Sequence, residues 1–364
     1  MKVKDVASYL EELAPLEYQE SYDNSGLLIG QENMKVTGVL ITLDCTEEII
    51  NESIKKKCNL IVTHHPVIFS GVKKINGNNY IERIIIKAIE NSIAIYAIHT
   101  NLDNVFNGVN SKIAEKLQLH NCSILAPKRG FLKKLVVFCP VENAFSLKES
   151  LFCAGAGEIG RYKNCSFSII GEGTFFPMKD ANPYLGEIEK LHKQQEERIE
   201  LIYPSHKEAI ILKSMRANHP YEQIAYQVYL LDNYNPSIGA GMIGELSEEI
   251  DSIQFIKILK KKMQADSIKY TSLVKKKIKR VALCGGSGGF LLDKAKKSNA
   301  DIFITSDIKY HQFFDAEDDI IIADIGHYES EQFTKNLLYD ILTKKFTKFA
   351  IQLSKINTNP INYL

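Results

Sequence analysis

Residues 59–66 read N-L-I-V-T-H-H-P, and this stretch decides the fold. Residues 60–62 are a short apolar run of strand-forming types, and Pro66 ends the strand and stiffens the turn. His64 and His65 are therefore expected where a buried strand leaves its sheet. Open α/β sheets place their ligand sites at this end of their strands.

Two further apolar runs end in the same way. One is I-A-I-Y-A-I at 93–98, and the other is I-I-I-A-D-I at 320–325. Both have the length and composition of buried strands. We therefore expect three strands to bring imidazole and carboxylate groups together at their ends. The polar residues that follow the three runs are His64, His65, His99, Asp103, His327 and Glu331.

Composition sets the class of protein. The 364 residues are enough for two domains, or for one large domain with an insertion. A formal net charge of +1 gives no electrostatic reason to expect nucleic acid or an anionic membrane as partner. Seven cysteines without a C-x-x-C pair indicate reduced thiols. Because no apolar run is long enough to cross a bilayer and the start lacks a signal-peptide core, we expect a cytoplasmic protein.

The order of predicted elements indicates two domains. Residues 1–128 alternate between strands and helices, which is typical of a mainly parallel sheet covered on both faces. Residues 129–234 follow a different order that suits a small ferredoxin-like α+β domain. From 235 to 364 the first pattern resumes. The predicted fold class is α/β: a discontinuous α/β domain of 1–128 and 235–364, with a ferredoxin-like domain inserted between its halves.

Three local features each have a structural interpretation. Asp44 follows a predicted strand and is expected to cap the next helix. The glycine-rich residues 239–244 predict a tight turn. The G-G-S-G-G run at 285–289 could cradle a phosphate between a strand and a helix. It lacks the Lys-Ser/Thr of a P-loop and does not complete G-x-G-x-x-G, so a tight turn is the simpler interpretation.

The predicted metal ligands are His64, His65, Asp103, His327 and Glu331. These ligand types suit zinc, iron, manganese, cobalt and nickel, and do not choose among them. Five ligands exceed one closed tetrahedral zinc site and suit two bridged metal ions that activate water for hydrolysis. Glu331 is the preferred bridge, because its i, i+4 spacing from His327 places both on one helix face. A single such residue more often caps a chain end, but three ends together favour a metal site.

The candidate catalytic residues are His99, Asp307 and His311. His99 could orient a metal ligand or shuttle a proton, and the alternative is a strand-end histidine with an ordinary hydrogen bond. Asp307 and His311 lie four positions apart after a predicted strand at 301–305. They could contact substrate or act as acid and base. The alternative for this pair is a helix-capping aspartate and a surface histidine.

Six motifs together resemble one known family, the GTP cyclohydrolase 1 type 2 homologues, also called the Nif-three-like family. They span nearly the whole chain in the family's order, and Tyr22 stands where many members have Trp. The motifs are S-Y-D-N-S-G-L at 21–27, T-H-H-P at 63–66, I-H-T-N-L-D-N at 98–104, C-G-G-S-G at 284–288, T-S-D-I-K-Y-H at 305–311 and G-H-Y-E-S-E at 326–331.

The resemblance implies a dinuclear metal site on an α/β fold, with its ligands at the same five positions. It also implies a ring-shaped homohexamer whose metal sites face an internal cavity. Long members of the family carry an inserted domain that resembles the PII/CutA type, and residues 129–234 fit that insertion. His219 and Tyr221 would then serve the inserted domain's own fold or contacts.

Two functional hypotheses follow. In the first, the protein is a hydrolase in which metal-activated water attacks a nucleotide or another phosphorylated small molecule. The family name implies opening of the GTP imidazole ring. In the second, it stores, delivers or senses metal, or binds a partner through the inserted domain, without cyclohydrolase activity. The convergent ligands favour the enzyme, and the missing nucleotide fingerprint favours the regulatory protein.

Overall fold

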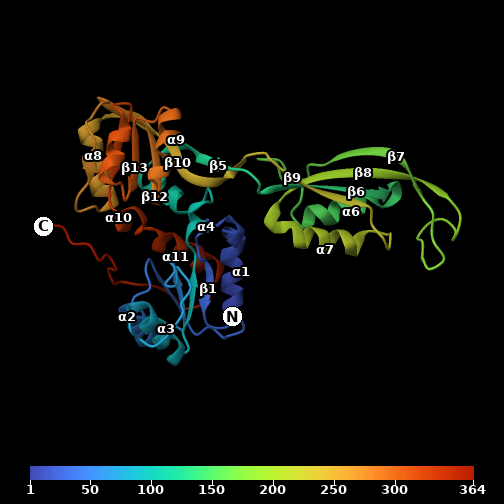
Figure 1. The fold of residues 1–364 in the computed structure, drawn as a ribbon, viewed down its shortest axis with the longest axis horizontal. Helices are drawn as coiled ribbons and strands as arrows, with labels where there is room; N and C mark the ends of the chain where they lie inside the picture. Colours follow the sequence, from blue (N-terminus) through green and yellow to red (C-terminus); the bar gives the residue numbers. More distant parts are fainter. The chain divides into compact units, whose positions relative to one another are not determined.

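The computed structural model describes residues 1–364 and divides into two compact units. The main unit comprises Met1–Pro127 and Pro236–Leu364, and the inserted unit is Lys128–Asn235. Both combine helices with sheets, so the chain is a mixed α/β protein (Figure 1). None of its helices is both long and apolar enough to span a membrane.

The first sheet of the main unit is mainly parallel. Its five strands lie in the order β1-β4-β3-β2-β15, and β1 alone runs antiparallel to its neighbour. All four residues of β3 are fully buried, as expected for a strand with both faces covered. The strands are β1 Gly26–Ile29, β2 Val39–Thr42, β3 Leu60–Thr63, β4 Ala94–Ala97 and β15 Ile351–Leu353.

The second sheet is mixed, with six strands in the order β11-β14-β13-β12-β10-β5. Its central strands β12, β13 and β14 run parallel, whereas β10 and β11 run antiparallel to their neighbours β12 and β14. The strands are β5 His120–Lys128, β10 Asn235–Asp251, β11 Lys269–Tyr270, β12 Lys277–Ser287, β13 Ile302–Ser306 and β14 Ile321–Asp324.

Helices bury apolar faces against both sheets. On the first sheet, Ile50 of α2 and Ile84 of α3 pack with Leu40, Ile61 and Ile95 from three strands. Burying each of these side chains contributes about 1.5–3 kcal/mol relative to exposure. The helices of the main unit are α1 Val3–Leu13, α2 Glu47–Lys55, α3 Tyr80–Glu90, α4 Thr100–Asp103, α5 Val109–Leu117, α8 Ser252–Met263, α9 Leu292–Lys297, α10 His327–Glu331 and α11 Thr334–Lys345.

Parallel register determines where the polar strand ends lie. In the first sheet β2, β3 and β4 are paired without offset, so their carboxyl ends share one edge. Asp44, His65 and His99 follow these three ends. In the second sheet Asp307 follows β13 and His327 follows β14, which are also parallel neighbours. The groups expected to carry chemistry therefore stand beyond the carboxyl edges of the two sheets.

Two local predictions were wrong. Residues 239–244 form part of strand β10 and not a tight turn. A side chain on Gly239 would come within 2.2 Å of the carbonyl oxygen of Ala126, so close packing against β5 explains this glycine. Asp44 does not cap helix α2, because Thr46 does so by accepting a hydrogen bond from the Ile49 backbone N–H.

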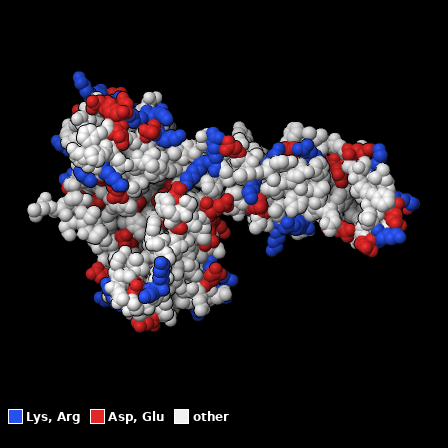
Figure 2. All heavy atoms as spheres, viewed as in Figure 1, with Lys and Arg blue, Asp and Glu red and all other residues white.

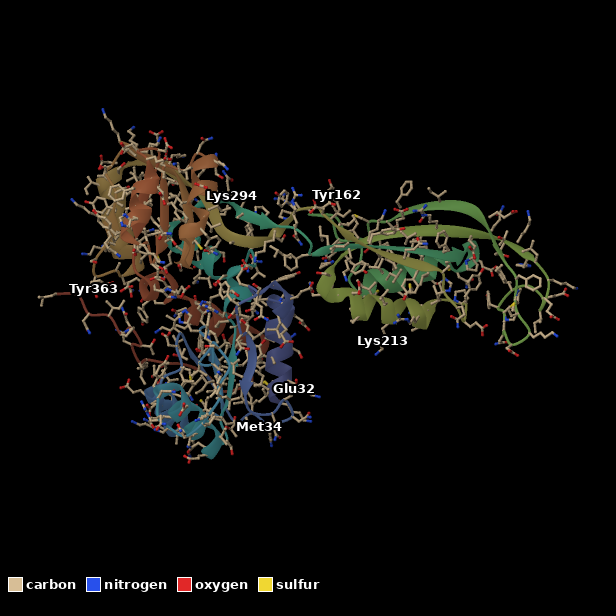
Figure 3. All side chains as sticks on the ribbon, in the orientation of Figure 1. Glu32, Met34, Tyr162, Lys213, Lys294 and Tyr363 are labelled. Atoms are coloured by element: carbon tan, nitrogen blue, oxygen red, sulfur yellow. The ribbon has the colours of Figure 1, made fainter.

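The inserted unit is a four-stranded antiparallel sheet in the order β7-β8-β6-β9 with helices α6 and α7. Leu147 of α6 and Met215 of α7 are fully buried in one cluster with Val137 and Ile199 of the sheet. Lys213 of α7 points away from the sheet (Figure 3). The elements are β6 Leu132–Pro140, α6 Val141–Cys153, β7 Phe167–Phe175, β8 His192–Pro204, α7 Glu208–Asn218 and β9 Tyr226–Leu231.

Charged side chains of both signs are interspersed on the surface. The face shown in Figure 2 has lysines and arginines mixed with aspartates and glutamates over each unit. This distribution agrees with the formal net charge of +1. A field of one sign that would steer a polyanion is therefore not evident on this face.

Candidate metal centre

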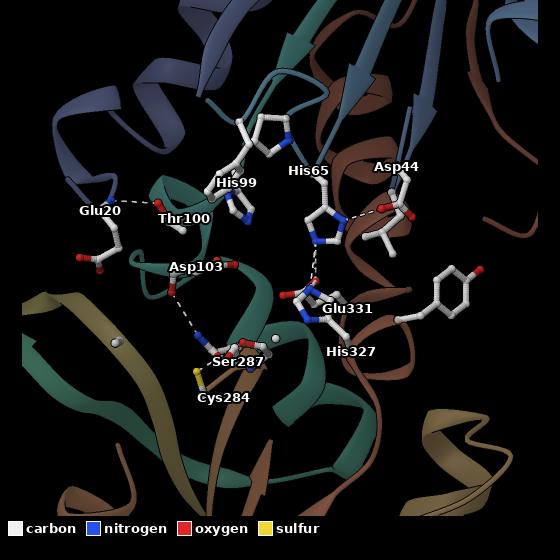
Figure 4. A pocket seen from close by; sticks show the side chains of 18 of the residues that line it. Glu20, Asp44, His65, His99, Thr100, Asp103, Cys284, Ser287, His327 and Glu331 are labelled. Atoms are coloured by element: carbon white, nitrogen blue, oxygen red, sulfur yellow. Dashed lines mark hydrogen bonds and ion pairs between the residues drawn. The ribbon is translucent and has the colours of Figure 1, made fainter. Parts of the chain in front are cut away.

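Four of the five predicted ligands line one cavity of the main unit, which has a volume of about 520 Å³ (Figure 4). His65, Asp103, His327 and Glu331 line it, and His64 lies fully buried beside them. They come from the turn after β3, the end of α4 and the helix α10. Residues more than 260 positions apart in sequence are thus in contact, as the hydrogen bond between His65 and Glu331 shows.

The first group of potential ligands is His64, Asp103 and Glu331. His64 Nδ1 donates to the carbonyl oxygen of Ile98 at 2.8 Å, so Nε2 carries the lone pair. That buried nitrogen has no hydrogen-bond partner. It lies 3.7 Å from Asp103 Oδ1 and 3.8 Å from Glu331 Oε1, too far for hydrogen bonds. Burial lowers the pKa of His64, which keeps the lone pair available.

The second group is His65, His327 and Glu331. Glu331 Oε2 lies 2.8 Å from His65 Nε2 and 3.1 Å from His327 Nε2, and the two nitrogens are 3.3 Å apart. The opposite ring nitrogens are held by carboxylates. His65 Nδ1 contacts Asp44 Oδ1 at 2.6 Å, and His327 Nδ1 contacts Asp307 Oδ2 at 2.6 Å. Such carboxylate–histidine pairs orient imidazoles whose other nitrogen binds a metal.

Electrostatics at this site call for a cation. Burial disfavours the charged form of His65, but hydrogen bonds to Asp44 and Glu331 outweigh it and raise its pKa to about 10. His327 is likewise desolvated, yet Glu331 and Asp307 raise its pKa to about 11. Burial and the charge of Glu331 raise the pKa of Asp103 well above its usual value. Without a metal, protons on the imidazoles balance the carboxylates, and a bound cation would replace those protons.

His99 is a third imidazole at the same place. Its ring nitrogen lies within 4.8 Å of those of His64 and His65. His99 Nδ1 contacts Asp23 Oδ1 at 2.7 Å, and the backbone N–H of Thr100 donates to Asp23 Oδ2 at 3.0 Å. These contacts outweigh burial and hold the pKa of Asp23 below its usual range. Since Nδ1 is engaged, Nε2 is the nitrogen that His99 offers to the cavity.

The other two candidate catalytic residues have different surroundings. Asp307 holds His327 Nδ1, so it acts on the site through that imidazole. His311 is exposed, and its ring packs against Tyr310 and Phe314 at centroid distances of 5.2 and 6.3 Å. His311 does not line the cavity. The i, i+4 spacing does not place this pair on one helix face, because Asp307 has φ +58° and precedes the 3-10 turn Tyr310–Ala316 that carries His311.

The glycine run at 285–289 is not a tight turn, because residues 285–287 form the end of strand β12 and a 3-10 turn begins at Gly289. The N–H groups of Gly285, Gly286 and Gly288 donate to side chains of Asn110, Ser330 and Thr305. They are not free to cradle a phosphate. Gly286 has φ +65°, and a Cβ there would lie 2.3 Å from Glu331 Oε1. Glycine at this position leaves the space that the Glu331 carboxylate occupies.

The C-terminal segment also contributes to the site. Thr358 Oγ1 donates to Asp44 Oδ2 at 2.5 Å, so both oxygens of Asp44 are engaged. Asn359 Nδ2 donates to Glu329 Oε1 at 3.0 Å, and Asn359 and Ile361 line the cavity. Sequence reasoning assigned no role at the site to these residues or to Asp23. Asp23 stands in a conspicuous D-N-S-G turn, but no local pattern marks Thr358.

Aromatic side chains surround the mouth of the cavity. Tyr22, Phe69 and Phe290 line it with 63%, 48% and 68% of their surface exposed. The rings of Tyr22 and Phe69 lie 6.2 Å apart and are tilted by 32°. No lysine or arginine lines the cavity. The lining therefore combines exposed aromatic rings with an absence of basic side chains.

Comparisons with known proteins match the whole chain. The model of the family Duf34/NIF3 (NGG1p interacting factor 3) matches residues 1–360. Proteins named GTP cyclohydrolase 1 type 2 homolog are 36% identical in Staphylococcus epidermidis, with full coverage of both chains, and 34% identical in Bacillus subtilis, with 99% and 98% coverage. A Bacillus cereus protein related to NIF3 has a crystal structure with TM-score 0.88 and 36% identity, covering 100% of this chain and 99% of the other.

Proposed function

The chain belongs to the Duf34/NIF3 family, and from that premise we propose that it holds two divalent metal ions and uses them to hydrolyse a small molecule that carries a planar ring. His64, Asp103 and Glu331 would hold one ion. His65, His327 and Glu331 would hold the other. Glu331 belongs to both groups, which supports its role as the bridge.

The unpartnered Nε2 of His64 carries this proposal. A buried polar atom without a partner costs about 1–3 kcal/mol, so native proteins seldom retain one without a reason. Here the nitrogen faces two carboxylates at 3.7 and 3.8 Å, and Asp103 Oδ1 also lacks a hydrogen bond. One neutral imidazole nitrogen and two carboxylate oxygens form a donor set that suits a divalent transition metal.

The protein residues would divide the remaining tasks. When bound, divalent ions lower the pKa of water and polarise an acceptor oxygen. Asp44 and Asp307 keep His65 and His327 oriented through their Nδ1 atoms. His99, held by Asp23, presents Nε2 to the cavity and is placed to exchange a proton with the reacting molecule.

The aromatic side chains that line the cavity suggest which substrate to test first. Tyr22 and Phe69 offer faces on which a purine could stack. Relatives at 34–36% identity carry the name GTP cyclohydrolase 1 type 2 homolog. GTP is therefore the first candidate substrate, with opening of its imidazole ring and release of formate as the reaction.

The test is formate release from GTP by protein loaded separately with zinc, manganese, iron, cobalt or nickel. Glu331→Gln keeps the shape of the side chain and removes the charge of the bridge, so it should abolish turnover. Release of formate that survives in Glu331→Gln would contradict the proposed chemistry. Release that requires Glu331 would support GTP as substrate and direct attention to His99.

One observation favours a second candidate, a metal-binding protein without cyclohydrolase activity. A triphosphate would bring several negative charges to a cavity that no lysine or arginine lines. If the protein binds metal tightly but releases no formate with any of the five metals, GTP is excluded. This second candidate, or hydrolysis of an uncharged ring, would then be preferred. Failure to bind any metal would contradict both candidates.

A further inference from the structure

A second cavity, of about 360 Å³, lies in the inserted unit and is independent of the metal centre. We propose that it binds a small organic cation, such as a methylated or alkylated ammonium group, against aromatic rings and carboxylates. We call it the aromatic cavity. The residues that matter for the argument are Phe175, Phe176, Tyr184, Glu196, Tyr221 and Glu222.

The walls of the aromatic cavity are held together by specific contacts. Strands β7 and β8 pair up to Phe175 and His192, and the connection between them folds back on itself. Glu189 donates its backbone N–H to the carbonyl oxygen of Pro177 at 2.8 Å. Asn182 donates its backbone N–H to Glu222 Oε1 at 2.9 Å, which ties this connection to the segment before β9.

Aromatic rings form an angled group around the cavity. The ring of Tyr221 lies 6.0 Å from that of Phe175 and 6.3 Å from that of Tyr184, with interplanar angles of 57° and 54°. Tyr184 and Phe176 are 50% and 51% exposed, so they are accessible to a ligand. Rings that meet at such angles turn their π faces in several directions around the cavity that they line. A cation within about 6 Å of such faces is attracted by the ring quadrupoles.

The charges at the cavity have one sign. Glu196 and Glu222 are its only ionisable acids or bases apart from tyrosine, and no lysine, arginine or histidine lines it. Tyr221 donates its hydroxyl to Glu196 Oε1 at 2.9 Å, which fixes the carboxylate beside the rings. An anionic ligand would be repelled here. A neutral apolar ligand would leave the carboxylates without a counter-charge, so an organic cation is the best match.

The probe is choline, compared with its uncharged carbon analogue 3,3-dimethyl-1-butanol, and binding to the full chain is followed by calorimetry or ligand-observed NMR. We expect choline to bind about 3- to 30-fold more tightly than the analogue, the range that cation–π attraction supplies. Equal affinities would overturn the proposal, because they would indicate an apolar cavity without selection for charge. Absence of choline binding would overturn it as well.

Variants locate the site. Tyr184→Leu should weaken choline binding about tenfold while leaving the fold intact, since half of this side chain is already exposed. Glu196→Gln should weaken choline but not the neutral analogue, because an amide oxygen still accepts from Tyr221. Tyr162→Leu is the matched control, a tyrosine of the same unit that is 74% exposed and outside the cavity. Equal losses in Tyr184→Leu and Tyr162→Leu would contradict the assignment.

Discussion

Two buried histidines, His64 in the main unit and His219 in the inserted unit, differ in how their ring nitrogens are bonded. In the inserted unit, His219 Nε2 donates to the carbonyl oxygen of Phe138 at 2.8 Å, and its Nδ1 accepts the backbone N–H of Tyr221 at 3.1 Å. In the main unit, His64 Nδ1 is bonded but Nε2 is not. Both ring nitrogens of His219 are thus satisfied within its own unit, whereas His64 keeps one buried nitrogen without a partner.

The same contrast extends to charge. Around His64 the carboxylates of Asp103 and Glu331 are buried close together, and burial with mutual repulsion raises the pKa of Asp103. Around His219 the only charged neighbour that affects its pKa is Glu196, and its influence is smaller than that of burial. A fold tolerates an arrangement like that of the main unit when a ligand stabilises it. Predictions that compare the two histidines therefore test the assignment of the metal centre.

The largest expected effect comes from removing the shared carboxylate. Loss of a residue that supports a metal ligand lowers metal affinity about 10- to 100-fold. Glu331→Gln should lower it further, because both ligand groups include Glu331. Competition titration with a chromogenic chelator measures this. Glu115→Gln, an α5 side chain that is 68% exposed, is the control and should bind metal like the unmodified protein. An unchanged affinity in Glu331→Gln would mean that the Glu331 carboxylate does not hold the metal ions.

The second effect should come from the partner of His327. Asp307→Asn keeps a side chain that tolerates the observed φ of +58° but weakens the hold on Nδ1. We expect metal affinity to fall about tenfold. Asp293→Asn, an acidic residue of α9 outside the cavity, should change nothing. If both variants bind metal equally well, the carboxylate–histidine pair has no part in orienting the ligand.

The sequence predicted those residues of this site that follow recognisable strands, and it missed those whose role depends on distant contacts. The five predicted ligands follow apolar runs that are recognisable as strands, so parallel pairing accounts for their place at the carboxyl edge of each sheet. It does not account for the meeting of the two edges, because His65 belongs to the first sheet and His327 to the second. Asp44 looked like a helix cap because both roles place a carboxylate after a strand. Only the three-dimensional fold shows that it holds His65 and is itself held from the far end of the chain.

The sequence also could not predict which distant segments pair with each other, for a related reason. The three residues of β15 carry little periodicity, yet they pair in parallel with β2 and bring the C-terminal segment back to the first sheet. Residues 239–244 looked like a turn because glycines permit turns, but they also permit close approach of two strands. In both cases the structure depends on the partner strand, which cannot be identified from the local sequence.

A third prediction tests whether the C-terminal segment supports the site through Thr358. Thr358→Val removes the hydroxyl that holds Asp44 Oδ2 while keeping nearly the same shape. Thr358 acts on His65 only through Asp44. We therefore expect metal affinity to fall by less than the factor of about ten that the loss of a direct partner costs. Thr358→Ser retains the hydroxyl and should restore wild-type affinity in the same competition titration. A Val variant indistinguishable from Ser would show that the C-terminal segment merely covers the cavity.

The smallest expected effect is a pH dependence of the inserted unit's stability around His219. Burial lowers the pKa of His219 below its usual value, against the opposing hydrogen bond to Phe138. The unfolded chain therefore takes up a proton at higher pH than the folded one. The stability that neutral His219 contributes is complete above a pH of about 6.5 and is lost as the pH falls from there through the folded-state pKa. A proton on Nδ1 would also displace the N–H of Tyr221.

Hydrogen exchange in the full chain, followed in peptides that cover 218–223, measures this loss between pH 7.5 and 5.5 after correction for intrinsic rates. Protection should decrease on acidification in the unmodified protein. His219→Gln can still donate to Phe138 but does not titrate, so its protection should be independent of pH in this range. If the two proteins lose protection in parallel, His219 is not the group that responds. The claim that the inserted unit's histidine is structural and neutral would then be wrong.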